Sequence, residues 1–160
     1  GNPPTDDKEI KLNSASLPTQ FDVVHCVVRA DDGLVYVCDR QHHRIQVFKS
    51  DGSFVTEFLY GSDTVDNNIP GMVADLAIWP DESQSFLIIA DGNTEAARIV
   101  RRDTGEAVTN VGRFGDYAGQ LNHLHVITVD SKGNIYTGEA GVNRVQKFAV
   151  IGSGSKSDVK

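Results

Sequence analysis

The sequence predicts an all-β fold built from repeated antiparallel sheets, and three observations lead to this prediction. Short runs rich in β-branched and aromatic residues recur along the chain, separated by turns rich in Gly, Asp or Pro. A segment near the N-terminus, residues 21–48, returns at residues 121–148 without a gap. No stretch has the apolar spacing of an amphipathic helix. Repetition of a short all-β unit is typical of β-propellers, in which each repeat forms one blade.

The two copies carry matching residue types at matching positions. A weaker third copy lies between them, in Leu76–Trp79, Phe86–Asp91 and Ala97–Val100. Three copies give a period of about 50 residues, which is long for a blade but within the range of propellers. The matching pairs of the two strong copies are His25/His125, Gly33/Gly133, Tyr36/Tyr136, Asp39/Glu139, Arg44/Arg144, Gln46/Gln146 and Phe48/Phe148.

The strands of the first copy follow from its residues. The β-branched run Val23–Val28 suits a buried strand. The pair Asp32–Gly33 predicts a tight hairpin turn, because glycine adopts a positive φ at no steric cost. After the second strand, Val35–Cys38, the segment Arg44–Phe48 alternates polar and apolar residues as a half-exposed strand does. With Phe54–Phe58 as the outer strand, the copy forms one four-stranded blade.

Charged residues recur at the end of the second strand and the start of the third. A carboxylate and an arginine placed there can pair and fix the loop between the strands. We therefore interpret these residues as parts of the repeat and not of a functional site. They are Asp39 with Arg44, Asp91 with Arg98, and Glu139 with Arg144.

The segment Asp39–Phe48 resembles the signature of NHL repeats, and so does Asn143–Phe148. The similarity covers roughly residues 17–150. Propellers of this family usually have six blades around a central channel, so the resemblance implies about three four-stranded blades of a six-bladed ring. Three blades cannot close a ring, and an open array leaves apolar faces and strand edges exposed. The other blades would come from the rest of the protein or from a second subunit.

The repeat also predicts the organisation of the chain. Residues 1–16 are expected to form a loop or a strand of a preceding blade. The three blades are expected over residues 17–62, 63–112 and 113–150, of which the second is divergent. Residues 151–160 are polar and are expected to form a flexible tail.

Composition argues against two classes of partner. The net charge is -7, whereas nucleic acids and anionic membranes attract basic surfaces. No apolar stretch is long enough for a transmembrane helix, and no signal peptide is visible. The two cysteines, Cys26 and Cys38, fall on neighbouring strands. Because the sequence does not define the register of those strands, we interpret them as small buried apolar residues in preference to a disulfide. The compartment stays open.

His25 and His125 are the candidate metal ligands. Each lies at the head of the innermost strand of its copy, a position that faces the central channel of a propeller, whereas the middle copy has Met72–Asp75 there. A third histidine two blades further on would complete a three-histidine zinc site with one open position. The alternative is that both are hydrogen-bonded residues of the channel wall. We interpret His123 as a flanking residue, and His42 and His43 as solvated loop residues.

The contexts Phe21–His25 and Leu121–His125 resemble those of the zinc-binding histidines in the peptidyl-α-hydroxyglycine α-amidating lyases. That family has a six-bladed NHL-type propeller with zinc on three histidines beside catalytic arginine and tyrosine residues. It cleaves an N–C bond in a carbinolamide and releases a peptide amide and glyoxylate. The resemblance implies a catalytic role for Arg40, which follows Asp39 as in the family's motif; its counterpart in the last copy is Ala140.

The sequence departs from the lyase pattern at several positions. The family's tyrosine lies in an Asp-Gly-Tyr motif, but here Asn93 follows Asp91 and Gly92. The third histidine has no candidate. Val126 stands where the family has an aspartate associated with structural calcium, so calcium is not expected.

Two functions therefore remain. One is a zinc-dependent amidating lyase, acting on a peptide-like or small-molecule substrate; the resemblance would place it outside the cytoplasm. The alternative is a non-catalytic NHL scaffold that binds a protein or a small ligand.

Overall fold

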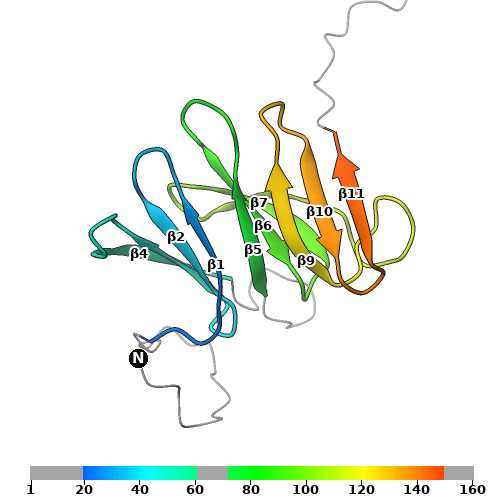
Figure 1. The fold of residues 1–160 in the computed structure, drawn as a ribbon, viewed down its shortest axis with the longest axis horizontal. Coiled ribbons are helices and arrows are strands. Elements are labelled where there is room, and N and C mark those ends of the chain that lie inside the picture. Colours follow the sequence, from blue (N-terminus) through cyan, green and yellow to red (C-terminus); the bar gives the residue numbers. More distant parts are fainter. Residues whose placement is uncertain (1–19, 61–71, 150–160) are drawn as a thin grey trace, which may run out of the picture.

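The computed structural model describes residues 20–60 and 72–149, which form three antiparallel sheets (Figure 1). The predictions for residues 1–16 and 151–160 lie outside the described residues. The first blade holds β1 (Val24–Arg29), β2 (Val35–Asp39), β3 (Arg44–Phe48) and β4 (Phe54–Leu59). The second holds β5 (Val73–Ile78), β6 (Phe86–Asp91), β7 (Ala96–Arg101) and β8 (Ala107–Val111). The third holds β9 (Leu124–Val129), β10 (Ile135–Glu139) and β11 (Arg144–Phe148).

The prediction of a partial propeller is confirmed. In each sheet the strands follow one another in chain order, as they do in propeller blades. The inner strands β1, β5 and β9 lie side by side in that order (Figure 1). The third sheet has three strands within the described residues instead of the four expected. In the same part of the chain, no helix is long and apolar enough to cross a membrane.

The core lies between the blades in two clusters. In the first, Cys38 and Val47 of the first blade pack with Leu76, Leu87 and Ile89 of the second. The alternation of side chains along a strand explains this arrangement, because successive residues point to opposite faces of the sheet and each face meets a different neighbour. Each fully buried aliphatic side chain contributes about 1.5–3 kcal/mol to stability. The second cluster joins Ala74, Ile88 and Ala97 to Leu124, Ile127 and Ile135.

The outward face of the first blade is uncovered. Ladder register makes Val24 equivalent to Val73 and Leu124, since these residues pair with Asp39, Asp91 and Glu139 respectively. The exposed fractions are 49% for Val24 and 63% for Val27, against 1% for Val73, 3% for Leu76, 0% for Leu124 and 6% for Ile127. The expectation that Val23–Val28 forms a buried strand is therefore wrong here, because the described residues include no preceding blade to cover it.

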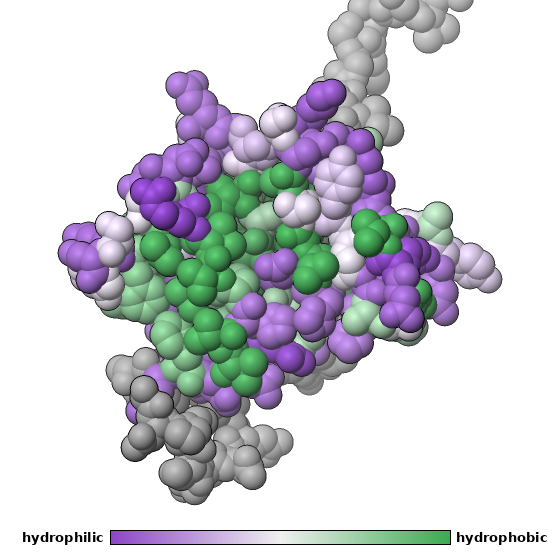
Figure 2. All heavy atoms as spheres, in the orientation of Figure 1, coloured by the Kyte–Doolittle hydropathy of each residue, from purple (hydrophilic) through white to green (hydrophobic). Residues whose placement is uncertain are grey.

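The far face of the third blade is uncovered in the same way. Val145 is 75% exposed, whereas its equivalents Ile45 and Ala97 are 0% exposed. Figure 2 shows apolar side chains gathered over the region of β1, β2 and β5 on the face in view. Both ends of the three-blade array thus present surfaces that the same repeat buries between its inner blades.

The three predicted ion pairs are confirmed. Arg44 Nε lies 2.8 Å from Asp39, Arg98 Nε 2.5 Å from Asp91, and Arg144 lies 2.7 Å from Glu139. Each carboxylate also accepts a backbone N–H from the segment that leads into the inner strand of its blade, donated by Asp22, Met72 and Asn122 respectively. The carboxylates therefore tie the second strand to both of its neighbours.

Two details of the charged positions differ from expectation. Arg98 does not open its strand: it is the third residue of β7 and lies opposite Ile89, which is the place of Gln46 in the first blade. Its long side chain still reaches Asp91. His42 is buried and not solvated, because its Nδ1 donates a 2.8 Å hydrogen bond to Asp39.

Candidate functional site

A β-bulge occurs at the same place in the inner strand of every blade. The ladder shifts between Val24 and Cys26 in β1 and between Val73 and Asp75 in β5. In β9 the same shift falls between Leu124 and Val126. The unpaired residues are His25, Ala74 and His125. A bulge redirects a side chain, so the repeat aims these three residues differently from the rest of their strands.

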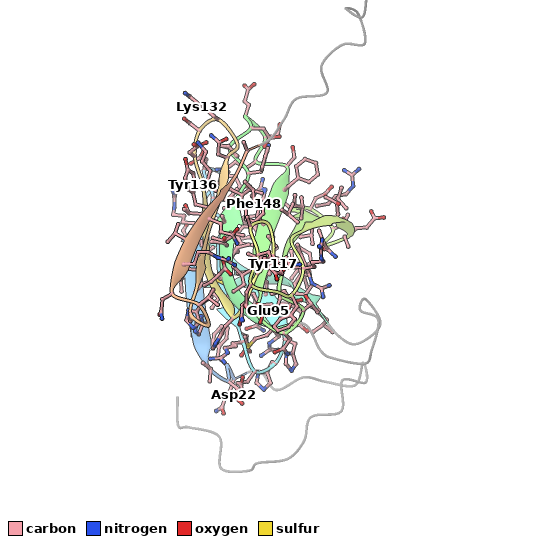
Figure 3. The ribbon with its side chains drawn as sticks, turned by 90° about the vertical axis from the view of Figure 1, so that its right-hand side faces the viewer. Asp22, Glu95, Tyr117, Lys132, Tyr136 and Phe148 are labelled. Atoms are coloured by element: carbon pink, nitrogen blue, oxygen red, sulfur yellow. A yellow bond between two sulfur atoms is a disulfide. The ribbon has the colours of Figure 1, made fainter. Side chains whose placement is uncertain are left out.

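The structure brings His25 and His125 together. Their ring centroids are 4.9 Å apart and the rings are inclined at 69°. His123, which precedes β9 with a φ of 54°, places its ring 5.9 Å from that of His125. Two histidines on alternate blades therefore meet across the inner strand of the second blade. Asp22, three residues before His25 in the chain, lies at the opposite end of the molecule from Lys132 (Figure 3).

The tautomer of His25 follows from its partner. Its Nδ1 is hydrogen-bonded to the backbone oxygen of the bulged Ala74. A carbonyl oxygen can only accept, so Nδ1 carries the proton and Nε2 keeps a free lone pair. Orientation of an imidazole by a backbone carbonyl in this way is typical of metal-ligating histidines.

His125 is set up as a neutral imidazole. Burial lowers its pKa below the ordinary histidine value, and electrostatic interactions with His25, His123 and Arg40 lower the pKa further. The carboxylate of Asp75 opposes this shift in part. At neutral pH the ring therefore presents a lone pair that can bind a metal ion or accept a hydrogen bond.

Arg40 lies beside the histidines without a carboxylate partner among the described residues. Its Nε donates to the sulfur of Met72 at 3.1 Å, and its backbone N–H donates to the carbonyl of Val23. A thioether is a weak acceptor that carries no charge, so the guanidinium is not neutralised. A half-buried guanidinium of this kind is suited to bind a carboxylate or another anion.

The described residues supply two metal donors and not a full set. Within residues 20–60 and 72–149 no three His, Cys, Asp or Glu side chains gather closely enough to hold a metal ion. The paired imidazoles of His25 and His125 fit zinc in chemistry and tautomer, but a closed site needs a donor from elsewhere. The side chain of Val126 has no oxygen that could bind calcium.

The expectation of two unlinked cysteines is wrong, because Cys26 and Cys38 form a disulfide. Their Cα atoms lie 4.9 Å apart as direct partners in the ladder between β1 and β2. A two-residue turn at Asp32–Gly33 would have placed Cys26 opposite Asp39. Instead Ala30 N–H bonds to Leu34 O, so the loop has one more residue and Cys26 lies opposite Cys38.

A pocket of about 380 Å³ extends from His125 over the far face of the third blade. Gly138 and Val145 line it. Their equivalents in the first blade, Cys38 and Ile45, are buried against the second blade. We therefore interpret this hollow as part of an uncovered blade interface and not as a substrate pocket.

Comparisons with known proteins agree with the fold. The NHL repeat family model matches residues 21–48. No curated protein sequence matches the chain. Among solved structures, the WD40 propeller domain of Doa1 superposes with a TM-score of 0.60 at 17% identity, over 84% of this chain and 39% of that one.

Two further structures extend the comparison. A nidogen/laminin complex gives a TM-score of 0.59 at 17% identity, over 82% of this chain and 44% of that chain. A catalytically inactive variant of virginiamycin B lyase from Staphylococcus aureus, solved with quinupristin, gives a TM-score of 0.57 at 15% identity. The match covers 87% of this chain and 45% of that chain. The chain thus spans about two fifths of the length of the solved propellers that it resembles. The NHL repeat model thus matches its first blade, and the chain folds as part of a β-propeller.

Proposed function

We propose that this chain carries part of the active site of a zinc-dependent lyase of the amidating type. Such an enzyme cleaves the N–C bond of a peptidyl-α-hydroxyglycine and releases a peptide amide and glyoxylate. The observation that supports the proposal is the meeting of His25 and His125 at 4.9 Å beside Arg40. Two structures of similar fold bear the names virginiamycin B lyase and streptogramin B lyase, so the fold is compatible with lyase chemistry.

Each of the three residues has a distinct role in this proposal. His25 would offer Nε2 to the metal, because its Nδ1 is committed to the carbonyl of Ala74. His125 would offer its lone pair as a neutral ring. Arg40 would hold the carboxylate of the substrate, since no carboxylate among the described residues neutralises it. Zinc in such a site acts as a Lewis acid that polarises a substrate oxygen.

Metal binding tests the proposal most directly. Zinc titration against a chromophoric chelator should show that the wild-type chain binds zinc and that His25→Ala and His125→Ala each weaken it at least roughly tenfold. His43→Asn serves as the matched control, because His43 has a φ of 52° and the equivalent residue in the third blade is Asn143. It should leave zinc affinity unchanged. A wild-type chain that takes up no zinc would overturn the proposal.

Glyoxylate release tests the substrate class. An N-acyl-α-hydroxyglycine is the appropriate probe, because it contains both the carbinolamide and the carboxylate. If the zinc-loaded chain releases glyoxylate, Arg40→Gln should raise the KM by removing the carboxylate partner. An unchanged KM in that variant would exclude Arg40 from substrate binding.

A non-catalytic scaffold is the second candidate function. Its support is that the described residues hold no third metal donor, and that the only stretch comparable with the lyase tyrosine motif, Asp91–Asn93, has asparagine instead of tyrosine. The ligand would then be a protein or a small molecule, and the net charge of -7 argues against nucleic acid and anionic membrane surfaces. For either function we propose an extracytoplasmic location, because the Cys26–Cys38 disulfide is typical of oxidising compartments.

A further inference from the structure

We infer that the Cys26–Cys38 disulfide is a positioning device that holds the strand of His25 against the strand end of Arg40. The inference rests on the proposed function for the identity of the site. Cys26 directly follows the bulged His25, and Cys38 is followed by Asp39 and then Arg40. The covalent link therefore joins the two segments that bear the candidate site residues of the first blade.

The link lies where the ladder is weakest. A bulge leaves its residue unpaired and disrupts the hydrogen bonds between the strands, and His25 is that residue in β1. Beyond the bulge, three hydrogen bonds join the segments: Asp22 N–H to the Asp39 carboxylate, Arg40 N–H to Val23 O, and Gln41 N–H to Asp22 O. The disulfide anchors the ladder on the other side of His25. A disulfide and a group of hydrogen bonds thus bracket the bulge.

The repeat itself shows that a blade does not need this disulfide to fold. The second blade has Asp75 and Ala90 at the two cysteine positions, and these residues pair with one another in the same register. The third blade has Val126 and Gly138, again paired. Both blades keep the bulge and the carboxylate at the end of the second strand without a covalent link.

The disulfide instead coincides with the combination of site residues. The residue after the strand-ending carboxylate is Arg40 in the first blade, Gly92 in the second and Ala140 in the third. Only the first of the three blades thus has both a histidine at the bulge and an arginine at this place. That blade also holds the disulfide.

The repeat provides the substitutions for a test. The double variant Cys26→Val with Cys38→Gly takes both residues from the third blade, where Val126 and Gly138 pair with one another, and is expected to fold. Val47→Ala is the control, because Val47 is buried in the same cluster but lies at the opposite end of the ladder, next to Phe48. This control should lower the melting temperature without faster amide exchange around the bulge.

Reduction of the wild-type chain with a phosphine removes the same disulfide without mutation. The phosphine becomes a phosphine oxide, with its oxygen from water, as the disulfide gains two electrons and two protons.

Two measurements decide the inference. Amide hydrogen exchange followed by NMR, in metal-free protein, should show faster exchange at Asp22, Arg40 and Gln41 in the double variant and in reduced wild type, but not in Val47→Ala. Zinc affinity should fall roughly tenfold in the double variant and stay unchanged in the control, as expected when a supporting contact of a metal site is lost. If melting temperature falls while exchange at these amides and zinc affinity do not change, the disulfide only stabilises the blade. If wild type binds no zinc, the proposed function fails, and the exchange data still decide whether the disulfide positions the two segments.

Discussion

The imidazole rings of His25 and His125 lie 4.9 Å apart and inclined at 69°, although one hundred residues separate them in the chain. Both are the bulged residues of inner strands, and the strand between them contributes only the small Ala74 at that place. The carbonyl of Ala74 orients His25. The second blade therefore contributes to the site through its backbone, and its small side chain leaves room for the two rings.

Equivalent positions of the repeat provide a matched test of blade packing. Ile45→Ala should destabilise the chain by about 2–5 kcal/mol, because Ile45 is fully buried between the first two blades. Val145→Ala should change stability by less than about 0.5 kcal/mol, because Val145 is 75% exposed at the same position of the third blade. Urea denaturation gives both free energies of unfolding. Equal losses would mean that another part of the protein covers the third blade.

The uncovered blade faces should promote self-association. Val27→Asp and Val145→Asp should each lower the association of this chain in sedimentation velocity, since they place a charge on an exposed apolar surface. Val108→Asp is the control: Val108 is similarly exposed but lies on the outer strand β8. A comparable effect of the control would show that association does not use the blade faces.

Removal of the carboxylate that ends the second strand of a blade should reduce the free energy of unfolding more in the first blade than in the third. Asp39→Ala removes the nearer carboxylate partner of Arg44, whose side chain is only 1% exposed and retains the more exposed Glu57 as an ion-pair partner in the described structure. The variant also removes the acceptor for His42 and for the backbone of Asp22. We expect a loss of about 3–5 kcal/mol. Glu139→Ala should cost clearly less, because the Arg144 side chain is 25% exposed and water can solvate it. Thermal and urea unfolding of the two variants measure these losses. A larger loss for Glu139→Ala than for Asp39→Ala would contradict the prediction.

Low pH should reduce the stability of the fold, in part because the Glu139 carboxylate becomes protonated. Burial by itself raises the pKa of this carboxyl. Hydrogen bonds from Arg144, Gln146 and the backbone of Asn122 lower the pKa by more than burial raises it, so the pKa lies below its ordinary value. A carboxyl whose pKa is lower in the folded than in the unfolded state stabilises the fold above the ordinary carboxyl pKa. That contribution is lost as the pH falls through the folded-state value.

The variant Glu139→Gln isolates this effect. It should be less stable than wild type at neutral pH, and its stability should fall less steeply as the pH drops below the ordinary glutamate pKa. Urea midpoints measured between neutral and strongly acidic pH give the two profiles. Parallel profiles would show that Glu139 does not contribute to the acid sensitivity.

Local features of the sequence determined the blades and their charged pairs. Strand periodicity is local, and the ion pairs join residues five to seven positions apart, as in Asp39 with Arg44 and Asp91 with Arg98. The equivalence of His25 and His125 also followed from the repeat, because identical local patterns fold into identical local structures. These properties depend on neighbouring residues, and so the sequence alone was sufficient to predict them.

The tertiary structure decided the features that depend on register and on packing between blades. One extra residue in the loop before Leu34 placed Cys26 opposite Cys38, and a local pattern does not distinguish two-residue from three-residue loops around Gly33. His42 is buried because it is hydrogen-bonded to the carboxylate of Asp39. Val27 is exposed because no other described blade packs against that face. The meeting of His25 with His125 depends on the angle between blades. That angle results from many apolar contacts between residues far apart in the chain, and no single segment of the sequence encodes it.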